Sequence, residues 1–162
     1  MSWSEHFLKE FDQEMAATRR MLERIPATGL DWKPHAKSRS LGELATHVTE
    51  LPRWGLRIGG DAFAVGSEKA PAMKSAADFL QRFDENVREA RKAISAMSET
   101  DLDGEFTVTR GGQVFFALKR RSLLRRVLLS HLIHHRGQLS VYLRIQGVAL
   151  PPIYGPTADE PM

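Results

Sequence analysis

Apolar residues recur every three or four positions along most of the chain, which places them on one side of an α-helix. Four segments show this spacing: residues 3–25, 41–58, 76–97 and 119–146. Each of the first three follows a serine that has an acidic residue three positions later, the capping box that satisfies free N–H groups at a helix start. Glycine or proline follows the first, second and fourth segments and stops them. Four amphipathic helices in one chain predict an all-α four-helix bundle.

The connections between these segments differ in length and character. Pro52 lies inside the second segment and predicts a kink, because proline cannot donate the backbone hydrogen bond that a helix needs there. Residues 59–74 predict a long crossover between the second and third helices. Residues 105–109 and 113–116 are β-prone and flank a Gly-Gly turn, which predicts a small β-hairpin packed on the bundle before the fourth helix. The length of 162 residues predicts one domain, 1–162.

Composition excludes several classes of protein. The chain is 42% hydrophobic and 27% charged, which is ordinary for a globular protein and unlike disordered or fibrous chains. It has no cysteine, so disulfides, thiolate metal sites and a cysteine nucleophile are excluded. The N-terminal stretch lacks the apolar run of a signal peptide, and no stretch approaches the ~18 apolar residues of a membrane span. We therefore expect a cytoplasmic protein without a membrane partner.

Three histidines fall within the apolar stripes. His131 and His135 are one helical turn apart in the fourth segment, and His47 lies in the stripe of the second. All three imidazoles are therefore expected to point into the bundle. A buried imidazole needs a partner for each ring nitrogen, and one divalent cation can satisfy three such groups together. The pattern predicts a metal site on His47, His131 and His135.

An alternative interpretation is purely structural. A single histidine in an apolar stripe is usually a hydrogen-bonded core residue, and the spacing H-x-x-x-H also arises by chance. The third inward histidine, on another helix, favours the metal site, because clustered neutral imidazoles are otherwise costly to bury. His134 lies beside the stripe and is expected to flank the site. His6 and His35 are expected at the surface or in loops.

The sequence resembles a known family, the DinB-like (YfiT-like) metal-binding four-helix bundles, over almost its whole length. The motifs that carry this resemblance are Trp32-x-Pro34, the string SLGELAxH that ends at His47, the string HxxHHRGQL that begins at His131, and the tail PIYGP at residues 152–156. The string His-His-Arg-Gly-Gln, placed about 85 residues after the first histidine, is the most specific of them.

The resemblance has several implications for fold and function. It implies that the second and third helices run in the same direction, and that the metal is held by His47, His131 and His135. Family members are often dimeric. Some similar proteins transfer a low-molecular-weight thiol, such as bacillithiol, mycothiol or glutathione, to an electrophile, and many have no assigned activity. The family name reflects induction by DNA damage and implies nothing about DNA binding.

A site with three histidines leaves a coordination position open, as catalytic metal sites do. That position can hold a water or a thiol, and either would lose its proton more readily there. Zinc, nickel, cobalt and iron all accept imidazole ligands, so the metal's identity stays open. Residues 132 and 133 are Leu and Ile, so the glutamate of the H-E-x-x-H peptidases is absent and a peptidase mechanism is disfavoured. Glu43 and Glu50 are candidate proton acceptors, although a cap partner and a solvated flank are their commoner roles, so the catalytic residues stay unassigned.

Two further features concern partners. The fourth segment begins with a cluster of five basic residues: Lys119, Arg120, Arg121, Arg125 and Arg126. The cluster could form a solvated face, bind an anionic cosubstrate or bind nucleic acid. The net charge of +3 and the lack of interleaved aromatic residues favour the solvated face with acidic neighbours, and nucleic acid is not expected. A second apolar row on the fourth segment predicts a homodimer: Leu129, Ile133, Gly137 and Val141.

These observations predict a divalent-metal-binding protein. The favoured function is a metal-dependent enzyme of the thiol-transferase or hydrolase type that acts on a small molecule, with a low-molecular-weight thiol as the most concrete cosubstrate. The alternative is a metal-binding or stress-response interaction module without catalysis.

Overall fold

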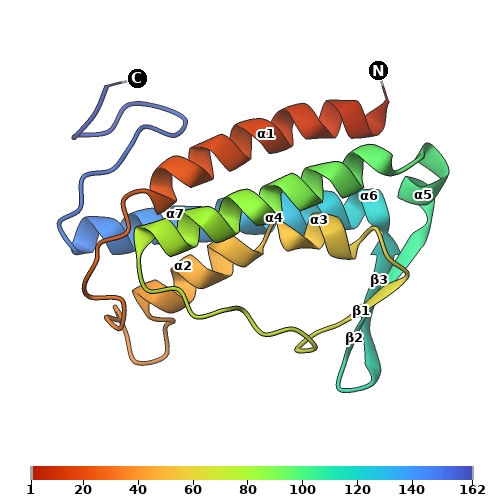
Figure 1. Ribbon diagram of the computed structural model, residues 1–162, viewed down its shortest axis with the longest axis horizontal. Coiled ribbons are helices and arrows are strands. Elements are labelled where there is room, and N and C mark those ends of the chain that lie inside the picture. The colour runs from red at the N-terminus through yellow and green to blue at the C-terminus, as the bar shows by residue number, and fades with distance from the viewer. Residues whose placement is uncertain (1, 162) are drawn as a thin grey trace.

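The computed structural model describes residues 2–161 as a mostly helical protein with a small three-stranded sheet (Figure 1). The helices are α1 (Trp3–Leu22), α2 (Leu41–Glu50), α3 (Arg53–Arg57), α4 (Ala76–Ala96), α5 (Glu99–Asp103), α6 (Arg120–Leu123), the π-helix η1 (Leu124–Ser130) and α7 (His131–Ile145). The strands are β1 (Ala62–Ala64), β2 (Glu105–Arg110) and β3 (Gln113–Lys119). Within residues 2–161, no helix has both the length and the apolar character needed to cross a bilayer.

Capping boxes begin the helices that the sequence predicted. At α1, α2 and α4 the cap serine accepts from the N–H three residues on, and the acidic side chain there accepts from the serine N–H. The short helix α5, which the sequence did not predict, begins with a fourth box between Ser98 and Asp101. Each box typically stabilises a helix by about 1 kcal/mol, which is enough to fix where the segment starts.

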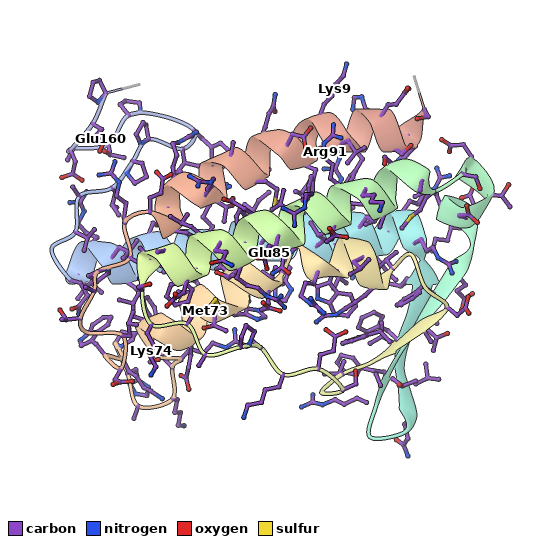
Figure 2. The ribbon with its side chains drawn as sticks, viewed as in Figure 1. Lys9, Met73, Lys74, Glu85, Arg91 and Glu160 are labelled. Atoms are coloured by element: carbon purple, nitrogen blue, oxygen red, sulfur yellow. The ribbon has the colours of Figure 1, made fainter. Side chains whose placement is uncertain are left out.

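The long helices pack against one another around a common apolar core. Figure 1 shows α2, α3 and α4 running in one direction and α1 and α7 in the other, so the long crossover between α3 and α4 returns along the molecule. Fully buried phenylalanines fill the layer between α1 and α4: Phe7, Phe11, Phe79 and Phe83. At the edge of this layer, Arg91 Nε lies 3.0 Å from Asp12 Oδ1, and Figure 2 shows Arg91 between the two helices, while Lys9 points away from them. The predicted common direction of the second and third helices is therefore correct.

Pro52 breaks the second helix instead of kinking it. α2 ends at Glu50, and α3 begins at Arg53 after two residues outside either helix. Gly55 then lets α3 approach α4 closely, because a Cβ at this position would lie 2.7 Å from the Cβ of Ala90. The crossover over residues 59–74 follows directly after α3.

The sheet is larger than the predicted hairpin. β2 and β3 pair in antiparallel fashion as predicted, and Gly111 and Gly112 form the turn with positive φ angles of 58° and 78°. β3, however, continues to Lys119, and β1 pairs in parallel with β2, with Phe63 opposite Val108. The crossover predicted over residues 59–74 thus contributes a strand. The prediction of an all-α fold with a two-stranded hairpin is corrected to a mostly helical fold with a three-stranded sheet.

The fourth predicted helix is not one regular α-helix. It begins at Arg120, one residue after its predicted start, and contains η1 before it continues as α7. The most buried side of α7 also differs from the predicted stripe, in which the spacing places Gln138 with His131 and His135. Arg136 is 2% exposed, while Gln138 is exposed. Arg136 is buried because its Nη1 lies 2.7 Å from Glu14 Oε2 and donates to Thr18 Oγ1. α7 is apolar on more than one side, so spacing alone misplaced its innermost face.

Candidate metal centre

The structure brings His47, His131 and His135 together. His47 lies on α2, and the other two lie one turn apart at the start of α7. The Nε2 atom of His131 is 3.3 Å from Nε2 of His47 and 2.9 Å from Nε2 of His135. One ligand atom from each ring lies within 4.8 Å of the other two, and all three side chains are partly buried. The three histidines are thus positioned so that they could hold a metal ion.

Hydrogen bonds on the far side of two rings fix their protonation. His131 Nδ1 lies 3.3 Å from the carbonyl oxygen of Val127, and His135 Nδ1 lies 2.7 Å from Oε1 of Gln138. Both oxygens accept, so each Nδ1 must carry the proton, and each Nε2 then presents a lone pair to the cluster. Two lone pairs 2.9 Å apart repel one another unless a cation lies near both. The arrangement is therefore one that a bound cation would stabilise.

The π-helix ends beside the bond to Val127. The backbone N–H of His131 donates to the carbonyl of Leu128, three residues back. The Val127 carbonyl accepts from the ring of His131 itself. π-Helical turns within α-helices occur frequently at functional sites, and here the irregular turn lies directly before the first histidine of the pair.

Burial keeps the rings neutral. Burial, followed by the nearby charges of Arg39, His135 and His131, lowers the pKa of His47 from 6.5 to about 3. The pKa values of His131 and His135 are also lowered, chiefly by burial. Neutral imidazole is the form that binds metals, so the histidines need lose no side-chain proton to act as ligands near neutral pH.

The donor set fits a divalent ion. Three nitrogens held ~2.0–2.1 Å from one ion lie roughly 2.9–3.4 Å from one another in octahedral or tetrahedral geometry. The observed Nε2 separations of 3.3 and 2.9 Å fall in that range. No carboxylate belongs to the cluster among the residues that the structure describes. A site of three neutral nitrogens leaves room for an external ligand.

Two cavities of different polarity reach the cluster. A largely apolar cavity of about 580 Å³ is lined by His131, Trp54 and the aromatic residues of β3. A smaller cavity of about 220 Å³ is lined by His47 together with the charged residues Glu50 and Glu68. Trp54 lines both cavities. His131 therefore borders an apolar cavity, and His47 borders a second cavity that also contains charged side chains.

Comparison with known proteins decides the family. The model of the DinB family matches residues 1–161. The chain belongs to the DinB family. It is 27% identical to the protein YrdA of Bacillus subtilis (strain 168) over 156 residues, which are 96% of this chain and 90% of YrdA. The resemblance read from the histidine motifs is thereby confirmed.

Solved structures of similar proteins share the fold. A DinB-like protein of Bacillus cereus ATCC 10987 has a TM-score of 0.71 at 23% identity, covering 93% of this chain and 97% of that one. The DinB-like protein YjoA of Bacillus subtilis has a TM-score of 0.70 at 21% identity, covering 92% and 97%. A putative DinB family member from Exiguobacterium sibiricum 255-15 also reaches 0.70 at 21% identity, covering 94% and 97%. At these identities the likeness is one of fold.

The two candidate proton acceptors of this DinB-family chain lie outside the histidine cluster. Glu43 completes the capping box with Ser40, as predicted. Glu50 is not the solvated flank that the sequence favoured, because its side chain is 15% exposed and its Oε1 lies 2.6 Å from Arg82 Nε. Asn86 also donates to Glu50. His134 is exposed and flanks the cluster, with its ring centroid 4.8 Å from that of His135.

Two residues near the DinB site were missed by sequence reasoning. Gln138 holds the ring of His135, and its i+3 spacing on the same helix was a usable signal for that contact. Arg39 lies close enough to lower the pKa of all three histidines, yet it stands in the loop before α2, where no periodicity indicates a direction. The carbonyl of Val127 left no sequence signal, because any residue supplies one.

The predicted acidic neighbours of the basic cluster are present. Lys119 and Arg121 pair with Asp103 at 3.3 and 2.9 Å, and Arg125 pairs with Glu10. Arg120 donates instead to backbone carbonyl oxygens of Ile58, Gly60 and Glu105. Arg126 alone in the cluster has no ion-pair or hydrogen-bond partner among the described residues. Most of the cluster thus serves the fold.

Proposed function

We propose that this DinB-family protein binds one divalent metal ion through the Nε2 atoms of His47, His131 and His135 and is a metal-dependent enzyme acting on a small molecule. The observation that carries the proposal is the convergence of three neutral imidazoles whose Nε2 atoms lie 2.9 and 3.3 Å apart. The ordinary alternative for buried histidines, a polar partner for every ring nitrogen, leaves these facing atoms unexplained.

The chain's own residues orient the site. The Val127 carbonyl and Gln138 hold the Nδ1 protons of His131 and His135, which fixes the ring directions. Trp54 and other apolar side chains line the cavity beside His131. An ion bound here would supply a Lewis acid that lowers the pKa of a water or a thiol at its open position.

A low-molecular-weight thiol is the cosubstrate we favour. The cluster contains no carboxylate among the described residues, so no side chain is placed there as a general base. A thiol has a pKa of about 8.5 and needs little help to ionise, whereas water at about 15.7 needs far more. Thiol transfer to an electrophile therefore needs less help from a general base than hydrolysis does. Zinc, nickel and iron all suit three imidazoles.

The scaffold that we propose for the site is a four-helix bundle. The first helix of this bundle is α1, and the third is α4. The second is the broken helix α2–α3, and the fourth is the irregular helix α6–η1–α7. The ligands come from the second and fourth of these helices, which places the ion between two elements that the core holds rigidly.

Consumption of thiol tests the function. Protein loaded with zinc, nickel or iron(II) is mixed with glutathione or bacillithiol and an electrophile such as a chloroaromatic compound, and loss of thiol is followed. We expect loss with the loaded wild type and none with chelator-treated protein or the variant His135→Ala. The matched variant His134→Ala, beside the cluster, should remain active. Metal binding without turnover of any thiol or ester would contradict the enzyme proposal and favour a non-catalytic metal-binding module.

A further inference from the structure

The apolar cavity beside His131 is open enough to take a ligand. Its volume of about 580 Å³ lies within the range of small-molecule sites. Three aromatic residues line it: Trp54 from α3 and Phe115 and Phe116 from β3. Phe115 is 58% exposed, so one aromatic face remains in contact with solvent until something covers it. Covering such a face removes apolar surface from water, which favours an apolar or aromatic occupant.

One cation stands at this otherwise apolar wall. Arg126 lines the cavity and belongs to η1, the irregular turn that ends just before His131. The other four members of the basic cluster donate to carboxylates or to backbone carbonyls. Arg126 has no carboxylate within ion-pair distance among the described residues. Among the described residues that line the cavity, Arg126 is the one with a permanent charge. Its guanidinium presents several donors in a planar fork that matches a carboxylate.

We propose that this cavity binds a small aromatic or aliphatic molecule that carries a carboxylate, with the carboxylate at Arg126 and the apolar body against Trp54, Phe115 and Phe116. We also propose that this molecule is the substrate of the metal centre, and only this second statement rests on the proposed function. His131 lines the same cavity, so a bound molecule lies beside the histidine cluster. Binding itself requires the cavity and Arg126, and not the ion.

A matched pair of probes tests the proposal. 1-Naphthoate and the neutral 1-naphthamide have the same apolar body, and their binding is measured by isothermal titration calorimetry on the chelator-treated protein. We expect the naphthoate to bind about fivefold more tightly, the upper end for a partly exposed ion pair. The variant Arg126→Gln should remove this preference without changing the affinity for naphthamide. The variant Phe115→Ala should weaken both probes.

Arg125 provides the control. It is the neighbouring exposed arginine, but it pairs with Glu10 and does not line the cavity. Arg125→Gln should therefore leave the affinity for both probes as in the wild type. Equal affinity for the two probes, or a preference for naphthoate that survives Arg126→Gln, would overturn the proposal. Failure of the proposed function appears separately, as a protein that binds no metal or turns over no substrate, while its preference for naphthoate is unchanged.

Discussion

Gln138 contributes to the site through a single hydrogen bond to His135. Its side chain is exposed and its Oε1 accepts from His135 Nδ1 at 2.7 Å, so it orients a ring without belonging to the core. The histidines were predictable because helical periodicity places them on inward faces. Gln138 was predictable in hindsight from its spacing. Arg39 and the Val127 carbonyl were not, because a loop side chain and a backbone group have no positional pattern in the sequence.

Replacement of Gln138 by alanine should weaken metal binding without unfolding the protein. Loss of a residue that orients a metal-binding histidine typically costs about 10- to 100-fold in affinity, because the ring direction and tautomer are no longer fixed. Competition with a fluorescent chelator measures the affinity, and circular dichroism checks the fold. Gln81→Ala, an exposed glutamine on α4, is the control. Affinities of Gln138→Ala and Gln81→Ala that agree within twofold would contradict this role for Gln138.

The partly buried ring of His47 makes the metal-free protein sensitive to acid. Its pKa is 6.5 in the unfolded chain and about 3 when folded. Below pH 6.5 the His47 ring is therefore protonated in the unfolded chain but stays neutral in the folded chain. The free energy of unfolding falls as the pH drops toward 3. For this partly exposed ring we expect a loss of roughly 1 kcal/mol by pH 5. Urea denaturation of chelator-treated wild type and His47→Gln at pH 7 and 5 measures it, and an identical pH effect in both would refute it.

Helices and strands were predicted well where one face alone is buried. The starts of α1, α2 and α4 follow from their capping boxes, and the hairpin follows from its Gly-Gly turn. Two elements could not be predicted. The π-helical turn of η1 differs too little in period from an α-helix over seven residues, and β1 is a three-residue strand whose pairing depends on tertiary contact with β2.

The contact of α3 with α4 depends on the absence of a side chain at Gly55. Gly55→Ala should destabilise the protein by about 1–3 kcal/mol, because the new methyl would lie 2.7 Å from the Cβ of Ala90. The second variant Ala90→Gly removes that methyl and loses helix propensity. The double variant should therefore be more stable than the sum of the two single changes implies, which chemical denaturation measures. Strict additivity would show that the contact is not the cause.

The whole molecule retains an apolar strip on α7 that its own core does not cover. Of the row predicted as a dimer interface, Leu129 is buried in its own chain, while Gly137 and Val141 are exposed. Ile145, one turn further, is 57% exposed. The proposed homodimer interface is therefore centred on Val141 and Ile145, nearer the C-terminal end of α7 than the sequence pattern indicated.

Charge at this strip should abolish dimerisation. Introducing a carboxylate in two copies at a two-fold interface buries like charges, so Val141→Glu should be monomeric where the wild type is dimeric. Multi-angle light scattering at micromolar concentration gives the mass, and Val114→Glu, an exposed valine on β3, is the control. A monomeric wild type would contradict the proposed dimer.

The metal content of the purified protein tests the central claim most directly. Protein expressed and purified without added metal is analysed by inductively coupled plasma mass spectrometry, beside the variants His47→Ala, His135→Ala and His134→Ala. We predict about one divalent transition-metal ion per chain in the wild type and in His134→Ala, with little in the other two, because three neutral nitrogens share the ion. A folded wild type that neither contains nor takes up such an ion, or equal metal in all three histidine variants, would contradict the site.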